Sequence, residues 1–550
     1  MPSPAQRPRA PLLWLLLPLI AGLSAAKAWR PPACGLWPLA LAALVAGLIA
    51  LACAVTAGRR GARGWGLSLG VAGALGGFVF LQLRVPQLHA AADPTPREVT
   101  VTIRVVQTFP AAPQSRSLGG IGVITATGTE DPALPGRRIY FSAIRRISVP
   151  PLRSGSYAVR GVLEPLPADP TGEGFSDYLA NLGVRAVLGR ARILREVTPP
   201  GWFPHWCDHA RNRFEGILRH GLDAHPQPAA LYVAMLLGGK AALSPDQQNA
   251  FTRSGTFHIF AISGLHIGVI AGALQATLRL LRVPRRPAVV LCLALLWLYA
   301  QITGGNTPAL RAFLMIAFLL VAREFQLTRN TLAALVASAL ATLLLDPLQC
   351  FGSGFQMSYT VVTALVVFGV PLGERWLAAW RPFALLARTE WRWHHRAVAW
   401  GGRKLLGAGA AGWAAFLAST PSSIGFFQVF SPGSLAANLV IVPAAALAIV
   451  GGFLSLVAGL AGLLPLSAVA NGAAASIIFA MNWVLEKATA WPGIYFPAEF
   501  KAGWMAPAAL AVLTGLLLAG SAARWSRRTG GFWPPAILVA LLLIFAVKYP

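Results

Sequence analysis

The stretch His258-Ile-Phe-Ala-Ile-Ser-Gly-Leu-His266 places two histidines, a serine and a glycine inside an apolar run that is otherwise typical of a membrane helix. Polar and ionisable side chains are costly at membrane depth, so they occur there mainly where they line a path or a site. The stretch therefore predicts a membrane-embedded chain in which a few polar residues have a task beyond filling the bilayer.

The composition of the whole chain agrees with a membrane location. Of its 550 residues, 56% are hydrophobic and only 12% are charged, and the mean hydropathy is +0.60. Soluble domains carry about a quarter charged residues. Charge-free runs such as Leu12–Ala26, Leu36–Ala57 and Ala536–Val547 reach or approach the roughly 20 residues that cross a hydrocarbon core. The fold class expected is a polytopic α-helical membrane protein.

About 12 to 13 membrane spans are expected, in two groups. The stretch 433–464 contains Pro443 and Gly451-Gly452, so it is read either as one tilted helix or as two short ones. The expected spans are 12–28, 36–57 and 65–83 in the N-terminal part, 1–84, and then 257–281, 287–303, 308–322, 330–345, 355–372, 405–420, 433–460, 466–487, 505–522 and 532–548 in the transmembrane domain, 257–550.

Basic residues exceed acidic residues by 46 to 19, which gives a net charge of +27. The first explanation in a membrane protein is the excess of Lys and Arg in cytoplasmic loops. With one crossing per span, the clusters Arg59–Arg63, Arg279–Arg286, Arg323–Arg329, Arg375–Lys404 and Arg524–Arg528 all fall on one side. This predicts a multi-pass membrane protein with a cytoplasmic N-terminus and with 85–256 extracytosolic. A polyanionic substrate would account for any remaining excess.

Residues 85–200 contain no span and instead alternate short apolar and polar runs between turn signals. This spacing predicts a small β-barrel or sandwich inserted between the membrane parts. Residues 201–256 are amphipathic and predict helices that lie on the membrane surface or pack against the bundle. The expected strands are Val99–Val106, Ile121–Thr127, Arg138–Ile144, Tyr157–Leu163 and Val184–Ile193.

Several segments, in a fixed order over roughly 10–460, carry a resemblance to a known family. They are Gly174–Gly183, Leu236-Leu-Gly-Gly-Lys240, His258–Gly268, Gly304-Gly-Asn-Thr-Pro-Ala-Leu-Arg311, Gly354-Phe-Gln-Met-Ser-Tyr359 and Ser419-Thr-Pro421 with Asn438. Together they resemble the ComEC-type competence family, the polytopic proteins of bacterial DNA uptake. The first of them is similar to the end of that family's extracytosolic OB-like domain.

This resemblance implies an inner-membrane channel component that passes single-stranded DNA into the cytoplasm during natural transformation. It implies that the inserted domain is an OB-like barrel. It also implies membrane lipid and single-stranded DNA as partners, together with a separate DNA receptor, a separate cytoplasmic motor and a separate nuclease. The family's C-terminal metallo-β-lactamase-like domain is expected to be lacking, since no His-x-His-x-Asp-His signature is present. No catalytic residue, metal or cofactor is expected, and no nucleotide-binding loop is present. Whether the chain forms a homo-oligomer is left open.

The polar residues inside otherwise apolar spans are the candidate path. They are mostly hydrogen-bond donors without a carboxylate, which suits an anionic cargo better than a proton or sodium relay. Ser263-Gly264 is a candidate helix break of the kind that lines transport sites. The alternative is that the histidines only bond neighbouring helices. The candidates are His258, Ser263, Gly264, His266, Arg311, Gln356, Ser358 and Asn438.

A second candidate region is a set of arginines around one predicted hairpin of the β domain. An OB-type barrel with such a patch can receive a single strand. A solvated surface is the alternative, because 85–200 carries 13 basic and 9 acidic residues and few aromatics accompany the arginines. The arginines are Arg137, Arg138, Arg145, Arg146 and Arg153, and the aromatics are Phe109, Tyr140, Phe141 and Tyr157.

Two other functions remain open from the residues. One is a transporter or permease for a different anionic solute. The other is an intramembrane hydrolase that uses Ser263 with His258 or His266, since Ser263 and His266 are three residues apart and share a helix face. No carboxylate is at hand to orient either histidine as a catalytic triad requires.

Overall fold

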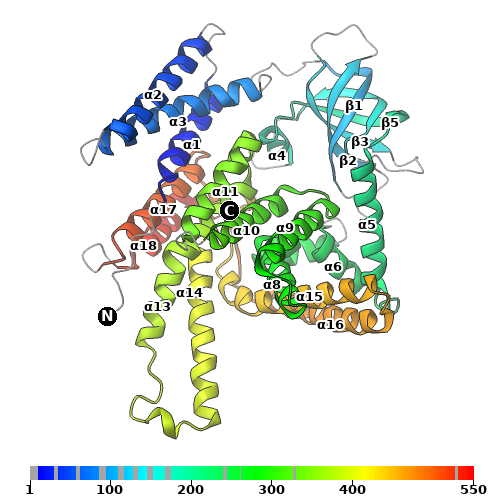
Figure 1. Cartoon of the computed structure of the whole chain (residues 1–550). Coiled ribbons are helices and arrows are strands. Elements are labelled where there is room, and N and C mark those ends of the chain that lie inside the picture. The colour runs from blue at the N-terminus through cyan, green and yellow to red at the C-terminus, as the bar shows by residue number, and fades with distance from the viewer. Residues whose placement is uncertain are drawn as a thin grey trace. The chain divides into compact units, whose positions relative to one another are not determined.

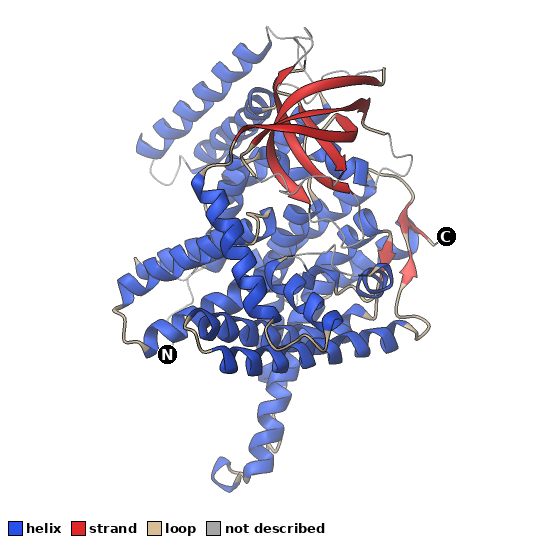
Figure 2. Ribbon diagram, turned by 90° about the vertical axis from the view of Figure 1, so that its right-hand side faces the viewer, coloured by secondary structure: helices blue, strands red, loops and turns tan. Residues whose placement is uncertain are grey.

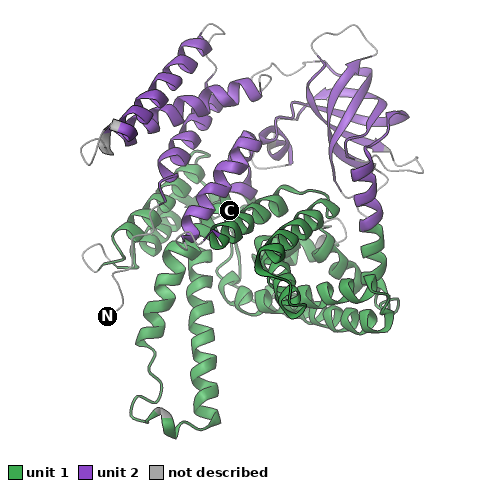
Figure 3. Ribbon diagram, viewed as in Figure 1, with its two compact units in different colours: residues 1–7, 211–324, 356–550 green, residues 8–210, 325–355 purple. Residues whose placement is uncertain are grey.

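The computed structural model describes residues 10–29, 35–56, 62–85, 95–109, 117–127, 134–144, 153–167, 175–238, 244–260, 262–325, 330–526 and 531–549. The chain divides into two compact units (Figure 3). Unit 1 comprises the described residues of 211–324 and 356–550, and unit 2 those of 8–210 and 325–355.

Unit 2 begins with three helices, α1 (Leu13–Ala28), α2 (Leu36–Thr56) and α3 (Ala62–Arg84), at the positions predicted for the first three spans. Glycines let α1 and α3 approach closely: a Cβ on Gly77 would lie 2.7 Å from the backbone oxygen of Leu19. The Gln82 side chain donates to the Ala26 carbonyl at 3.0 Å, which ties the ends of the two helices together. Two more helical elements complete this part of the unit, α11 (Thr331–Leu345) and η4 (Pro347–Phe351).

The rest of unit 2 is a closed five-stranded barrel, drawn in red at the top of Figure 2. Its order is β1-β2-β3-β5-β4, and only the β3–β5 pair is parallel. Alternate residues such as Val101, Ile103, Phe141 and Leu188 fill its interior. The strands are β1 (Arg97–Phe109), β2 (Ser117–Thr127), β3 (Arg138–Ile144), β4 (Ser156–Pro165) and β5 (Ala186–Thr198), which confirms all five predicted strands.

A short helix, α4 (Phe175–Asn181), connects β4 to β5 and covers part of the outer face of the barrel. Its Leu179 is buried against Ile121 and Val184. The side chain of Lys27, at the end of α1, donates to Asn181 Oδ1 at 2.6 Å. Within unit 2, α4 is thus held both by the barrel and by a membrane helix.

In its described residues, unit 1 is helical apart from two short two-stranded sheets, β6-β7 and β8-β9. Its first helix, α5 (Trp202–Arg219), begins in unit 2 and enters unit 1 at Arg211, and α12 enters at Gln356. The further elements are α6 (Pro226–Leu237), α7 (Pro245–Arg253), η3 (Phe257–Phe260), α8 (Gly264–Leu280), α9 (Arg285–Ile302), α10 (Thr307–Glu324), α12 (Ser353–Ala364), η5 (Leu365–Gly369), α13 (Val370–Ala379), η6 (Arg388–Glu390), α14 (Trp393–Phe427), β6 (Val429–Phe430), α15 (Ser434–Leu460), α16 (Leu464–Thr489), β7 (Phe496–Pro497), β8 (Glu499–Phe500), α17 (Met505–Ala522), α18 (Pro534–Leu541), η8 (Leu542–Ala546) and β9 (Val547–Lys548).

The core of unit 1 forms around α6, whose residues Leu231 to Leu237 are all buried. They pack with apolar side chains of α8, α9, α10, α15 and α16. A polar network crosses the same region: Asn471 Nδ2 donates to the carbonyls of Ile217 and His220, and Asn471 Oδ1 accepts from the Tyr232 hydroxyl at 3.1 Å. The helix α6 is therefore an interior element of unit 1.

The membrane prediction is confirmed as a class. In the described residues, seven helices are long and apolar enough to cross a bilayer, and five shorter apolar helices accompany them. The stretch 433–460 is a single helix, α15, with Pro443 inside it, so the two-helix alternative is wrong. The prediction of a span from 257 is also wrong at its start, because α8 begins only at Gly264.

Candidate functional site

The polar stretch that opens the competence-like segment is a break between two helical elements. His258 lies in the short 3-10 helix η3, and Ser263 is the extended residue that precedes α8, with φ −98° and ψ 174°. The Ser263 N–H donates to His266 Nδ1 at 3.3 Å. In a continuous helix, this N–H would instead donate to a backbone carbonyl. The remaining 17 residues of α8 span about 26 Å, less than a full hydrocarbon core.

His266 is fully buried, and its two ring nitrogens have different surroundings. Nδ1 lies 3.0 Å from Ser263 Oγ and accepts from the Ser263 N–H. In the neutral ring the proton is then on Nε2, which is a donor. Nε2 is buried and has no hydrogen-bond partner within the described part of the chain. A buried donor without a partner costs about 1–3 kcal/mol unless water or a ligand accepts from it.

His258 has a different environment. Its Nδ1 lies 3.2 Å from the Gly255 carbonyl, so Nδ1 is the donor of the neutral ring and Nε2 is free to accept. The side chain keeps solvent-accessible surface although protein atoms surround it densely enough to desolvate it.

Three of the segments that resemble the competence family meet in space. The chain turns at Gly238, after α6, and a Cβ there would lie 3.2 Å from Ile262 Cδ1 and 3.7 Å from Asn306 Nδ2. Gly238 and Gly304 have φ of +72° and +99°, which strain any residue with a side chain. The glycines of these segments thus allow the end of α6, the break before α8 and the turn before α10 to touch.

Arg211, on α5, joins the same meeting point, and the sequence analysis did not single it out. Its Nη2 donates to the Gly238 carbonyl at 3.1 Å, and its Nη1 lies 3.9 Å from where a Cβ on Gly304 would be. The Tyr299 hydroxyl donates to the neighbouring Leu236 carbonyl. An arginine on the polar face of an amphipathic helix carries no sequence signal that separates it from a solvated one.

The other candidate path residues are distributed over three helices of unit 1. Arg311 is 3% exposed in the second turn of α10, and a buried guanidinium persists only with partners or water. Asn438, half-buried on α15, has a buried Oδ1 that accepts from none of the described residues. Gln356 and Ser358 are half-buried on α12.

Ser422 on α14 is a polar residue that the sequence analysis missed. It directly follows the Ser419-Thr-Pro421 segment, and it is only 3% exposed. Its Oγ, like His266 Nε2 and Asn438 Oδ1, is buried without a hydrogen-bond partner in the described ranges. Its signal in the sequence was weak, because serine is common in apolar helices as a partner of the helix's own carbonyls.

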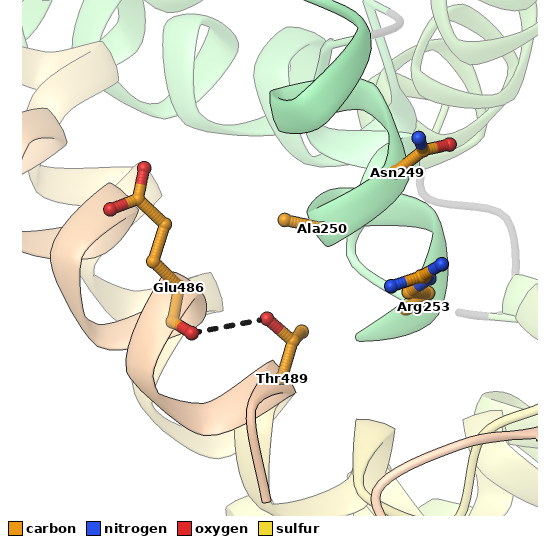
Figure 4. Close-up of a pocket in the computed structure, with 5 residues that line it drawn as sticks. All are labelled: Asn249, Ala250, Arg253, Glu486 and Thr489. Carbon is orange, nitrogen blue, oxygen red and sulfur yellow. Dashed lines mark hydrogen bonds between the residues drawn. The ribbon is translucent and has the colours of Figure 1, made fainter.

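An open recess of about 290 Å³ lies between α7 and α16 and combines both charges (Figure 4). Arg253 and Asn249 line one wall, and Glu486 and Thr489 line the other. The Thr489 hydroxyl donates to the backbone oxygen of Glu486 at 3.2 Å, and Glu486 also accepts from Asn482 at 2.6 Å. With a carboxylate in its wall, this recess does not select for an anion.

Of the arginines predicted around one hairpin of the barrel, the three described ones lie at two different ends of the barrel. β5 lies between β3 and β4, so β3 and β4 form no hairpin. Arg137 and Arg138 are at the end of the barrel where β5 starts, whereas Arg153 precedes β4 at the end where β5 finishes. Arg138 donates to the Leu182 carbonyl at 3.0 Å. Arg145 and Arg146 lie outside the described residues.

The aromatic residues of the barrel divide into core and surface. Phe141 and Tyr157 are buried in the barrel interior. Phe109 and Tyr140 instead join Phe175 and Tyr178 of α4 on the outer face, with the Tyr140 and Phe175 ring centroids 5.3 Å apart. Phe175 and Tyr178 stack at 6.1 Å and are 54% and 40% exposed. Burial raises the pKa of Tyr140, so that its hydroxyl stays protonated.

Most of the exposed arginines on the described barrel strands lie on β4 and β5, and Arg104 on β1 is exposed as well. A recess of about 390 Å³ on this side is lined by residues of β1, β2, β4 and β5, Arg195 among them. Glu98 offsets part of the charge: Arg160 donates to it at 2.7 Å and holds its pKa below the ordinary value. The exposed arginines of these two strands are Arg160, Arg190, Arg192 and Arg195.

Comparison with known proteins identifies the family of the segment that contains the break before α8 and the candidate path residues. Residues 235–527, more than half of the chain, match the family described as Competence protein. The chain belongs to the competence protein family. The matched segment contains all eight candidate path residues of this family member, whereas Arg211 and the barrel precede it.

Two curated relatives of this competence-family chain match over part of its length. ComE operon protein 3 of Bacillus subtilis (strain 168) is 30% identical over 142 residues, which is 26% of this chain and 18% of the relative. Competence protein ComA of Neisseria gonorrhoeae is 37% identical over 146 residues, 24% of this chain and 20% of the relative. The aligned stretches thus span about a fifth of each relative. No solved structure matches the chain.

Within the described ranges, no group of three or more His, Cys, Asp or Glu side chains is arranged to hold a metal ion.

Proposed function

We propose that this protein is the inner-membrane channel component that passes single-stranded DNA into the cytoplasm during natural transformation. The observation that carries the proposal is the set of buried polar atoms at His266 Nε2 and Asn438 Oδ1, for which the described residues supply no partner. A buried polar group without a protein partner calls for water or a ligand beside it. Both residues lie in the segment that matches the competence family.

In the proposed topology, His266, Arg311 and Asn438 lie at a similar depth in the membrane. With the N-terminus in the cytoplasm and the barrel outside, α8, α10 and α15 all start at the extracytosolic side. His266, Arg311 and Asn438 each lie within the first two turns of those helices. They then form an entrance rather than a continuous lining, and His258 precedes them at the surface.

The chemistry of the candidates suits a polyanion. Phosphates crossing a membrane must be met by cations or donor groups. Arg311 supplies a fixed charge, His266 Nε2 a donor, and none of the eight candidates is a carboxylate. A strand of any base sequence can be met in this way, because these groups recognise the backbone.

The barrel is proposed to receive the strand outside the membrane. Its ring pair Phe175 and Tyr178 is exposed, and bases stack on such rings irrespective of sequence. A DNA receptor, a cytoplasmic motor and a nuclease are proposed as separate partners, because neither strand cleavage nor ATP hydrolysis is assigned to a described residue.

One geometric observation favours a second function. Ser263 Oγ lies 3.0 Å from His266 Nδ1, the distance of a nucleophile from its base in an intramembrane hydrolase. Against it, Nδ1 already accepts from the Ser263 N–H, and His266 Nε2 has no carboxylate partner among the described residues to orient it. A permease for another anion would use the same donors as the DNA channel.

The test is a deletion strain complemented with single variants, assayed for entry of labelled DNA and for transformant yield. We expect His266→Ala and Arg311→Ala to lower both at least tenfold at normal protein level, and His220→Ala, an exposed histidine, to leave both unchanged. A deletion strain that takes up DNA normally would refute the proposal. Ser263→Ala would inactivate the hydrolase, whereas the channel would lose one candidate path hydroxyl and keep the bond from the residue 263 N–H to His266 Nδ1.

A further inference from the structure

The connection between α13 and α14 carries a cluster of positive charge. The two helices run side by side (Figure 1), and seven basic but only two acidic residues occur in 374–404. We call Arg381–Arg396 the basic tip. The apolar part of α14 starts only at Leu405, so the tip lies outside any membrane span. No site is assigned to it by the competence match or by the path described above.

The basic tip is a folded structure with its own small core of rings. Phe383 packs edge-on against Trp391 at 6.0 Å and against His395 at 4.6 Å. The Arg392 N–H donates to His395 Nδ1 at 3.2 Å, which caps the first turn of α14. The Trp391 indole N–H donates to the Leu386 carbonyl at 3.4 Å.

Packing between the helices holds the tip in place. The ring of Trp380 lies against Gly402 of α14, where a Cβ would come within 2.6 Å of it. Trp376 of α13 likewise contacts Gly409. Glycines of α14 thus let the two helices approach closely next to the tip.

That surface combines exposed cations with an exposed indole. Trp393 is 81% exposed and lies edge-on to His394 at 5.8 Å. Arg392 and Arg396, one residue before and three residues after it, are exposed as well. The only acidic residue between 380 and 404 is Glu390.

The excess of Arg in cytoplasmic loops explains the charge of the tip but not its form. A loop that only holds the orientation of the protein needs neither a ring core nor a solvent-exposed tryptophan between arginines. Cations beside an aromatic face are instead the combination that holds single strands: the cations meet phosphates, and the ring stacks on a base. Charge complementarity therefore selects a polyanion with flat bases as the occupant.

We propose that the basic tip binds single-stranded nucleic acid, with Trp393 as the stacking ring and Arg392 and Arg396 as phosphate contacts. The inference rests on the proposed function, because in that topology the tip is at the cytoplasmic end and takes the strand as it leaves the membrane. It adds an exit site at the opposite face from the entrance at His266.

The test uses the full-length protein in nanodiscs of zwitterionic lipid. An oligonucleotide that carries photoreactive thymidines is crosslinked, and the attached peptides are mapped by mass spectrometry. Adducts within 391–396 are expected. Fluorescence anisotropy of a labelled oligonucleotide should show Kd at least fivefold weaker for Trp393→Ala and for Arg396→Gln, with near-normal Kd for Trp393→Phe, which keeps a ring. Trp533→Ala and Arg213→Gln, also exposed, are the matched controls and should bind as the wild type.

Three results would overturn the inference. One is unchanged oligonucleotide affinity in both tip variants with crosslinks elsewhere. Another is that the tip variants lose binding to anionic vesicles but keep their affinity for the oligonucleotide, which would make the tip a lipid contact. The third is that the tip variants no longer bind a cytoplasmic protein partner but still bind the oligonucleotide. A deletion strain that still takes up DNA refutes the proposed function but leaves the crosslinks at the tip to be explained, so the two failures are distinguishable.

Discussion

At the scale of single residues, His266 stands out in unit 1 because its two ring nitrogens have different roles. One ring nitrogen accepts from the Ser263 N–H that begins α8, and the other is a buried donor that no described residue satisfies. The first contact shapes the helix start and the second is available to water or cargo. A substitution therefore separates the two tasks: His266→Asn keeps a short acceptor near Ser263 and removes the Nε2 donor.

We expect His266→Asn to leave protein level and thermal stability close to wild type and to lower DNA entry at least tenfold. The measurement compares nanodisc melting curves with uptake of labelled DNA. Equal loss of stability and uptake would make His266 a structural residue only, because helix packing would then explain both effects.

Asn471 is the residue whose loss should cost most stability. Its side chain satisfies two carbonyls and the Tyr232 hydroxyl inside unit 1. Asn471→Ala removes these three hydrogen bonds from unit 1, so we expect a loss of about 2 kcal/mol or more in the free energy of unfolding. Asn482→Ala removes one exposed bond to Glu486 and should change it by less than about 0.5 kcal/mol. Denaturant titration of both variants checks the difference.

At the scale of elements, the start of α8 and the start of α14 use the same device, a backbone N–H that donates to a histidine Nδ1 three residues later. At α8 the histidine is buried in the bundle, and at α14 it stands in the basic tip outside the apolar span. Burial and, after it, the neighbouring His394 and Arg392 lower the pKa of His395 from its ordinary 6.5. His395 is therefore neutral at pH 7 and able to accept.

The stability of the basic tip should consequently depend on pH in one direction. Because the folded pKa lies below the unfolded one, neutral His395 stabilises the tip above about pH 6.5, and this contribution is lost as the pH falls below that value. Histidine NMR of the labelled protein should show His395 titrating below 6.5, and His394→Gln should raise its pKa. A His395 signal that titrates above 6.5 would contradict the account.

At the scale of the whole molecule, the barrel is a closed element with a hydrophobic core of its own, separate from the core around α6. Closure leaves no strand edge that needs a neighbour. We expect residues 86–200, expressed alone, to give β-type circular dichroism and a cooperative melt. The variant Val159→Asp, which buries a charge in the barrel core, should abolish the melt, whereas Val197→Asp, at an exposed position, should not. A fragment that is unfolded until joined to the helices would disprove the autonomy of the barrel.

The strands and helices could be predicted from the sequence because they depend on the pattern of apolar residues within each segment. Alternation of apolar and polar residues predicted all five strands, and apolar runs predicted the helices, since both follow from which faces a segment buries. The break at Ser263-Gly264 was visible as a polar interruption. The helix start was misplaced by seven residues because a side-chain acceptor, His266, replaces helical bonding there.

The sequence by itself determined the class of the molecule, a polytopic helical protein with an inserted barrel, and the residues too polar for their surroundings, because hydropathy and periodicity are properties of single segments. Only the tertiary structure decided which segments meet. Strand order separated Arg138 from Arg153, α4 brought Phe175 to Tyr140, and Arg211 reached Gly238 from 27 residues away. Such contacts depend on the packing of distant parts of the chain, and no local pattern encodes them.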